Sequence, residues 1–294
     1  MRKTLAVVIP LLLAGCANTP KPAQQSENSA KLIMAEPVAV PFQAEVELAR
    51  LDEILTRAKL KDEQRAELLY RRGVVFDAMG LGALARRDFN QAVHLQPTMA
   101  DAYNFLGIQA TSAEEYEKAY ENLDAAIELD PKHDYAYLNR GIALYYGNRP
   151  ALAVEDLETF LSHQPSDPYR VLWLYLADAK AHPKEAGPRL AYNATRLDTN
   201  AWANQLVDFY LGKITEPELL AGLKKGVRTN RELAERLCEA YFYLGKWQQA
   251  RGHLGEAINF FKLSLATNVQ DFIEYRYSRL ELKQIRRQLA QRAD

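Results

Sequence analysis

Small and large apolar residues recur along the chain with a period of 34 residues. Columns of glycine, alanine and proline share this period: Gly73, Gly107, Gly141; Ala85, Ala119, Ala153; Pro97, Pro131, Pro165. A leucine or an aromatic residue stands four positions before each glycine and sixteen after it: Leu69, Tyr103, Tyr137; Phe89, Leu123, Leu157. Several columns at one period predict a structural unit that is repeated along the chain.

This pattern resembles the tetratricopeptide repeat, which implies an all-α superhelix built from antiparallel helix pairs. In such a pair, the glycine of the first helix and the alanine of the second mark a close crossing, and the proline ends the second helix. We expect the large apolar residues to fill the space between successive units. The frames are 66–99, 100–133 and 134–167, and a fourth, 238–271, repeats the columns at Tyr241, Leu244, Gly245, Ala257 and Phe261.

The stretch 168–237 has helical patterning but lacks the glycine and alanine columns. Its length leaves room for two more helix pairs, and we interpret it as degenerate repeats. A last helix is predicted over 272–292, so the superhelix would fill 62–294. One stripe of that helix is basic, with Arg276, Arg279, Lys283, Arg286 and Arg287. The stripe is either the solvated face of a capping helix or a dock for an acidic partner or phospholipid head groups.

A narrow apolar seam precedes the repeats, in a helix predicted within 42–61. Its members are spaced by four and three residues: Ala44, Leu48, Leu51, Leu55 and Ala58. The seam either caps the first repeat or pairs with a second copy of the chain, with Leu48, Leu51 and Leu55 as the contact residues of a homodimer.

The first residues have the pattern of a bacterial signal peptide. Arg2 and Lys3 precede nine residues without a polar side chain, whereas a membrane-spanning helix needs about 20. Leu13-Ala14-Gly15-Cys16 resembles a lipobox, which implies cleavage after residue 15 and lipidation of Cys16. The alternative is a secretory signal with an incidental cysteine. Residues 16–41 would form the lipidated N-terminus and a flexible tether. In enterobacterial lipoproteins an Asp after the cysteine is a signal for retention at the inner membrane, so the resemblance, with Ala17 in this position, implies the outer membrane, facing the periplasm.

Charge and motifs argue against several functions. Lys and Arg number 37 and Asp and Glu 38, so no basic excess favours a nucleic acid partner. The chain lacks the motifs G-x-S-x-G, H-E-x-x-H, C-x-x-C and the P-loop. We therefore expect no catalytic residue, no metal and no cofactor. Cys238 is interpreted as a small buried apolar residue.

The repeats predict a concave surface lined by the first helix of each unit. Its predicted partner-binding residues are Tyr70, Val74, Asp77, Asn104, Ile108, Leu138, Ile142 and Tyr145. Such an apolar, tyrosine-rich groove suits a helix or an extended segment with apolar anchors. The alternative is that the C-terminal helix of the chain itself covers some of these residues.

Further strings extend the resemblance. Residues 138–147, 172–177, 208–212 and 241–246, with the lipobox and the repeats, are similar to the NlpI family of tetratricopeptide-repeat outer-membrane lipoproteins of enterobacteria. That resemblance implies a homodimeric, non-catalytic adaptor that binds a periplasmic C-terminal-processing protease, papain-like murein endopeptidases and other murein hydrolases. It implies regulation of peptidoglycan growth and cell division through degradation of the endopeptidase. The alternative is a fixed subunit of an outer-membrane assembly or a pilus-secretin complex.

Overall fold

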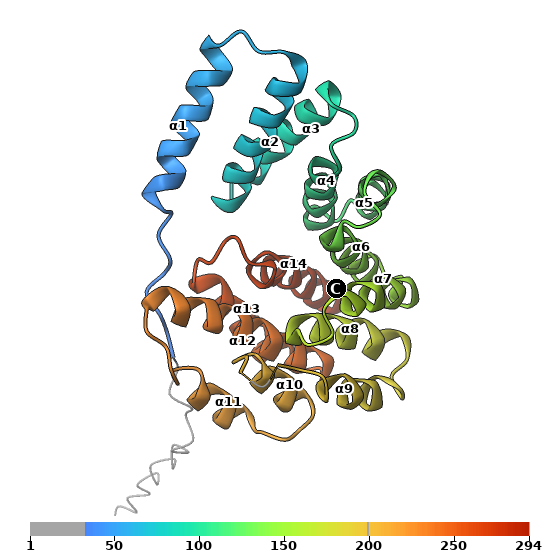
Figure 1. Cartoon of the computed structure of the whole chain (residues 1–294). Helices are drawn as coiled ribbons and strands as arrows, with labels where there is room; N and C mark the ends of the chain where they lie inside the picture. Colours follow the sequence, from blue (N-terminus) through green and yellow to red (C-terminus); the bar gives the residue numbers. More distant parts are fainter. Residues whose placement is uncertain (1–32, 199, 294) are drawn as a thin grey trace, which may run out of the picture. The chain divides into compact units, whose positions relative to one another are not determined.

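Helices form all the regular secondary structure that the computed structural model describes, in residues 33–198 and 200–293. The helices in chain order (Figure 1) are Phe42–Arg57 (α1), Asp62–Ala78 (α2), Gly82–Leu95 (α3), Ala100–Ser112 (α4), Tyr116–Leu129 (α5), Asp134–Tyr146 (α6), Pro150–His163 (α7), Pro168–Ala181 (α8), Ala186–Ala194 (α9), Asn204–Tyr210 (α10), Glu216–Gly222 (α11), Asn230–Ala250 (α12), Leu254–Ala266 (α13) and Ile273–Ala293 (α14). The predicted all-α fold is confirmed.

Most of the predicted N-terminal features lie outside the described residues. This applies to the leader 1–15, to Cys16 and to the tether as far as residue 32. Residues 33–41 do not form part of a free tether, because they are hydrogen bonded to the folded repeats. Val38 N donates to the Thr267 carbonyl at 2.8 Å, and Glu36 N donates to Asn230 Oδ1 at 2.9 Å.

The glycine column marks the crossing within each helix pair. A Cβ atom on Gly141 would lie 2.7 Å from Leu157 Cγ, and one on Gly73 would lie 2.6 Å from Phe89 Cε1. The large residue sixteen positions on therefore packs against the glycine of its own unit. Phe89 also fills the space between units, as expected, since its ring stacks on Phe105 of the next repeat with centroids 4.8 Å apart.

A further column of the repeat lies in the turns between paired helices. Gly80, Glu114, Asn148 and Gly252 all have positive φ, at 73°, 64°, 61° and 82°. The first three are 34 residues apart. The left-handed conformation reverses the chain between the two helices of a pair, and it costs a residue with a Cβ about 1 kcal/mol more than glycine.

The middle stretch forms four helices, α8 to α11, of which α10 and α11 have seven residues each. Gly212 and Gly226 adopt positive φ at the bends that follow α10 and α11. After α12 and α13, α14 packs on both and also contacts α4 (Figure 1). Trp173 of α8, Phe242 of α12 and Tyr277 of α14 share one buried aromatic core, so α14 is part of the fold's interior.

The apolar seam of α1 packs inside the chain. Leu51 and Leu55 are buried, and Leu55 lies in one cluster with Ala66 and Leu69 of α2. Leu48 is half-buried beside Val74 and Phe76. These three leucines therefore cap the first repeat and are not a free surface for a second copy of the chain.

Candidate functional site

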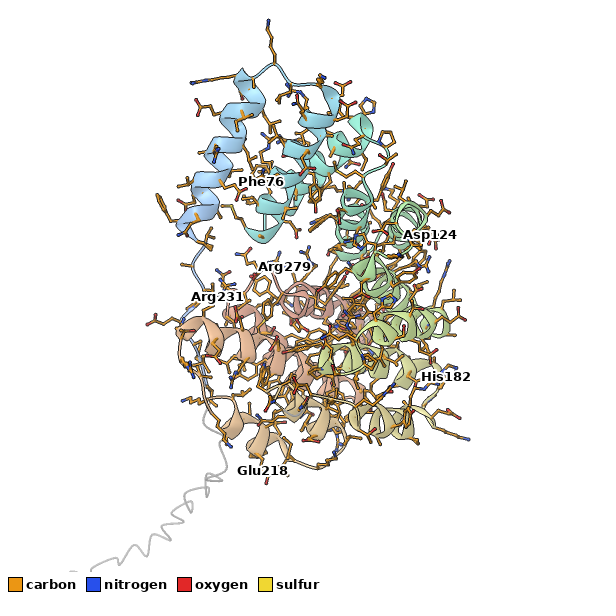
Figure 2. All side chains as sticks on the ribbon, in the orientation of Figure 1. Phe76, Asp124, His182, Glu218, Arg231 and Arg279 are labelled. Atoms are coloured by element: carbon orange, nitrogen blue, oxygen red, sulfur yellow. The ribbon has the colours of Figure 1, made fainter. Side chains whose placement is uncertain are left out.

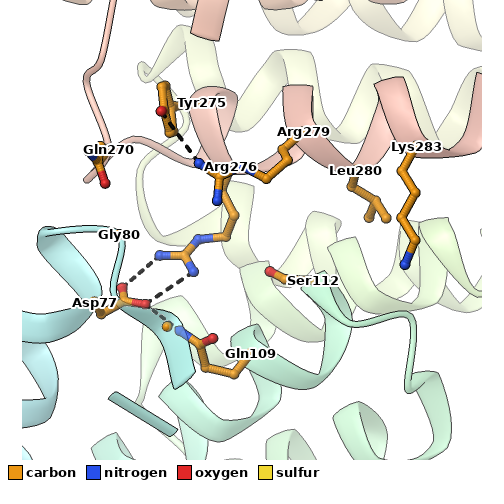
Figure 3. A pocket seen from close by; sticks show the side chains of 11 residues that line it. Asp77, Gly80, Gln109, Ser112, Gln270, Tyr275, Arg276, Arg279, Leu280 and Lys283 are labelled. Atoms are coloured by element: carbon orange, nitrogen blue, oxygen red, sulfur yellow. Dashed lines mark hydrogen bonds and ion pairs between the residues drawn. The ribbon is translucent and has the colours of Figure 1, made fainter. Parts of the chain in front are cut away.

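The C-terminal helix occupies part of the predicted groove. Arg276 of α14 donates to both carboxylate oxygens of Asp77 in α2, at 2.6 and 3.2 Å, and Gln109 of α4 also donates to this carboxylate (Figure 3). Burial by itself would lower the pKa of Arg276, but the Asp77 carboxylate more than offsets this effect and the pKa is raised. Asp77 is thus an internal partner of α14.

A second ion-pair cluster joins α14 to the turn between α4 and α5. The Glu114 carboxylate bonds Lys283 at 2.7 Å and Arg287 at 2.8 Å. Burial would raise the pKa of Glu114, and the hydrogen bonds from Arg287 and Lys283 outweigh it and lower the pKa. Three residues of the basic stripe, Arg276, Lys283 and Arg287, therefore pair with acids of the same chain. The sequence had left open a solvated face or a dock for an acidic partner. Arg279 lies on α14 where it faces α2 (Figure 2).

Some of the predicted groove residues are fully buried, and others are half-buried. Ile142 is fully buried in the core, and the buried Asn104 accepts a hydrogen bond from Asn139 at 2.9 Å. Neither offers side-chain surface to a partner. Tyr70, Val74 and Ile108 are half-buried, and burial together with the nearby Asp101 raises the pKa of Tyr70 to about 12.

Leu138 and Tyr145 line two separate pockets on either side of the middle of α6. The continuous groove predicted from repeat positions is therefore three smaller surfaces: one at Asp77, one at Leu138 and one at Tyr145. Their binding roles stay predictions. The division could not be read from the sequence, because it depends on where α14 lies.

The pocket at Tyr145 has a volume of about 360 Å³ and is lined by aromatic rings, and we call it the aromatic pocket. Tyr145 and Tyr210 are buried in it, whereas Tyr175 and Trp247 are half-buried. The rings of Tyr210 and Trp247 meet edge to face with centroids 5.2 Å apart, and those of Tyr175 and Tyr210 are 5.3 Å apart. Contacts of this kind hold the rings in one arrangement.

A buried ion pair forms one wall of the aromatic pocket. Lys246 of α12 bonds Glu281 of α14, which also accepts hydrogen bonds from Tyr146 at 2.8 Å and Gln249 at 2.7 Å. Burial would lower the pKa of Lys246, and the Glu281 charge reverses this effect and raises it. At the rim, Lys180 Nζ lies 3.6 Å from the centroid of the Tyr145 ring. The pocket can therefore hold an apolar side chain beside positive charge.

In the described part of the chain, no group of three His, Cys, Asp or Glu side chains could hold a metal ion. Cys238 is fully buried, and burial raises the pKa of its thiol, so it is not an activated nucleophile. His133, His163 and His182 pair with Asp101, Asp134 and Asp178. Among the described helices, none is long and apolar enough to cross a bilayer.

Comparisons with known proteins agree with the repeat architecture. No model of a known protein family matches the chain. A chain from the crystal structure of the APC/C hetero-tetramer Cut9–Hcn1 superposes with a TM-score of 0.50 at 15% identity, over 83% of this chain and 46% of that one. A tetratricopeptide repeat protein from Parabacteroides merdae gives a TM-score of 0.47 at 15% identity, over 82% of this chain and 98% of that one.

YrrB, described as a tetratricopeptide protein with an unusual peptide-binding site, gives a TM-score of 0.44 at 14% identity, over 82% of this chain and 99% of that one. At these identities the likeness is one of fold alone. The chain therefore has the all-α fold of antiparallel helix pairs that is found in tetratricopeptide-repeat proteins.

Proposed function

We propose that this chain is a non-catalytic adaptor that binds protein segments at the aromatic pocket. The observation that carries the proposal is the set of half-buried rings, Tyr175 and Trp247, beside the buried Tyr145 and Tyr210. Rigid aromatic side chains in a partly open concavity supply most of the binding energy at protein interfaces. A partner would insert an apolar side chain there, and Lys180 and Arg251 at the rim favour acidic residues next to that anchor.

The partners we propose are a C-terminal-processing protease of the periplasm, a papain-like murein endopeptidase and other murein hydrolases. This finer proposal rests on the resemblance of residues 138–147, 172–177, 208–212 and 241–246 to the NlpI family, and on the lipobox at Cys16. Lipidation of Cys16 would place the adaptor at the inner face of the outer membrane. By bringing the protease to the endopeptidase, the adaptor would limit cell-wall growth.

We also propose that the adaptor forms a homodimer through α1. Phe42 is 72% exposed and Val46 is 50% exposed, and both line a groove of about 630 Å³ between α1 and α2. Large apolar side chains exposed together are typical of interaction surfaces. This face replaces Leu48 and Leu55 as the proposed contact, because those leucines pack against residues of α2. Leu51 lies at the base of the same groove but is buried.

The binding experiment compares the purified protein with a double variant, Tyr175→Ala and Trp247→Ala, against immobilised papain-like endopeptidase. We expect the dissociation constant to rise by about 30-fold, since truncating a central aromatic anchor costs about 2 kcal/mol or more. The matched control is Tyr192→Ala, which removes an aromatic ring that is 65% exposed on α9, away from the pocket. Equal affinities of the wild type and the double variant would overturn the proposal.

A further inference from the structure

A third pocket, of about 350 Å³, opens beside Leu138 and differs from the aromatic pocket in its charge. Four acidic residues line it: Asp167, Glu239, Asp271 and Glu274. Arg170 is the one basic side chain in its lining. We call this site the acidic pocket.

Two of the four acids are neutralised by basic residues of the chain. Asp271 pairs with Arg231 at 3.2 Å, and Asp167 lies 3.6 Å from Arg170. The Arg170 guanidinium is also bonded to Asp134 and to the Phe160 carbonyl, so its charge is already used. The positive charge of Arg170 is therefore compensated by Asp134 and Asp167, and it does not neutralise Glu239 or Glu274.

Glu239 and Glu274 form no ion pair with any described residue. Both are buried, at 7% and 4% exposure. Burial raises the pKa of Glu239, and the charge of Glu274 raises it further. Burial also raises the pKa of Glu274, to about 7. Two buried carboxyl groups without a cation are unfavourable in their charged form, and a positive group placed between them would remove this penalty.

Three polar atoms of the pocket lining have no hydrogen-bond partner among the described residues. They are Glu239 Oε2, an acceptor, and two donors, Trp173 Nε1 and Arg170 Nε. Arg170 Nε lies 3.6 Å from the Asp167 carboxylate, whereas the other two atoms have no such neighbour of opposite charge. Native structures leave few buried polar atoms unsatisfied, so Glu239 Oε2 and Trp173 Nε1 are positions for ligand atoms. A single ligand that satisfies these two must carry a donor for the carboxylate and an acceptor for the indole N–H.

Aromatic rings complete the surroundings of the two acids. Tyr135, Phe160, Tyr169, Trp173 and Phe272 line the pocket, and Tyr135 is 60% exposed. Arg170 already lies over the Phe160 ring, with its Cζ 3.7 Å from the centroid. Aromatic faces attract organic cations such as guanidinium and ammonium, and a weakly hydrated guanidinium gains most.

We propose that the acidic pocket binds an arginine or lysine side chain of an extended protein segment. The positive group lies at Glu239 and Glu274, and a carbonyl oxygen of the segment accepts the Trp173 indole N–H. The rings favour this ligand over a hydrated metal ion. The proposal rests on the protein-binding function proposed above, but not on the partners named there.

The test uses two acetylated, amidated peptides that place one arginine, or one citrulline, between alanines. Citrulline has the shape of arginine without its charge. The readout is the NMR signal of the Trp173 indole N–H, assigned with Trp173→Phe. The indole of Trp247 lies in the aromatic pocket and serves as the internal reference, so failure of this site is distinguishable from failure of the aromatic pocket.

We expect the arginine peptide to shift the Trp173 signal with saturation, and the citrulline peptide to bind about tenfold more weakly or not at all. The Glu239→Gln variant should bind the arginine peptide more weakly than the wild type does, by a similar factor. Glu256→Gln is the matched control, because it removes the charge of an exposed glutamate on α13 that lies outside the pocket lining. If Glu239→Gln does not fold, Tyr135→Ala replaces it, since that exposed ring lines the mouth. Equal shifts with both peptides, or unchanged affinity in Glu239→Gln or Tyr135→Ala, would overturn the proposal.

Discussion

The Arg287 guanidinium of α14 donates two hydrogen bonds to the Glu114 carboxylate, at 2.8 and 3.1 Å, and Glu114 has a left-handed backbone with φ of 64°. The equivalent turn positions in other repeats are Gly80, Asn148 and Gly252, which adopt this conformation at less cost. The turn between α4 and α5 therefore accepts backbone strain and gains a contact with α14.

Substitutions at Glu114 separate the strain from the contact. Glu114→Ala should destabilise the fold by about 1–2 kcal/mol, because it keeps the left-handed strain and loses both ion pairs. Glu114→Gly should be about 1 kcal/mol more stable than Glu114→Ala, since glycine removes the strain. Urea unfolding gives the stabilities, and hydrogen exchange should show faster exchange at the end of α14 in both variants. An alanine variant as stable as the glycine variant would contradict this account.

The helix crossing in the second repeat leaves no room for a side chain on Gly107. A Cβ atom there would collide with the Leu123 side chain. Gly107→Leu should destabilise the protein by about 1–3 kcal/mol or more through overpacking. Glu121→Leu, on the exposed face of α5, is the control and should change the melting temperature little. If both variants have the melting temperature of the wild type, the helix crossing has been assigned to the wrong residue.

The two faces of α1 should respond differently to charge. Phe42→Glu with Val46→Glu should yield a folded monomer, because both residues are exposed in the chain. Leu55→Glu should instead destabilise the first repeat, since Leu55 is buried against α2. Light scattering reports the mass, and circular dichroism reports the helix content. A double variant that still has the mass of a dimer would place the interface elsewhere.

The buried Glu274 predicts a pH dependence of stability. Its pKa in the folded chain is about 7, raised from the model-compound value of 4.5. Between these values the folded chain keeps a proton that the unfolded chain releases, so the free energy of unfolding falls as pH rises through this window. The fall contributed by Glu274 is about 3 kcal/mol at most. Glu274→Gln should flatten this part of the profile in urea unfolding at a series of pH values.

The control for this measurement is Glu256→Gln, on the exposed side of α13. It should leave the slope of stability against pH as it is in the wild type. A Glu274→Gln profile parallel to that of the wild type would show that the buried carboxyl is not the source of the effect.

The sequence predicted the helix pairs well because their crossings require particular residue types. Gly107 must be small where Leu123 packs, and α3, α5 and α7 each end just before the periodic prolines. The left-handed turn positions could not be predicted from the sequence. Gly80, Glu114 and Asn148 share a backbone conformation, but their side chains have no chemistry in common.

The candidate site was harder to predict, because it depends on contacts between distant segments. Asp77 looks the same in the sequence whether it faces solvent or Arg276. The basic stripe of α14 likewise fits a solvated face or an internal partner. The acidic pocket was missed, because Glu239 and Glu274 are far apart along the chain and meet only when α14 packs on α12.

The adaptor function is tested most directly by a reconstituted digestion. The purified protein is mixed with the papain-like endopeptidase and the C-terminal-processing protease, and loss of the endopeptidase is followed on gels. We predict that the chain accelerates this loss only when the protease is present, and that the variant with Tyr175→Ala and Trp247→Ala does so less than the Tyr192→Ala control. Equal digestion rates with and without the chain would contradict the adaptor account.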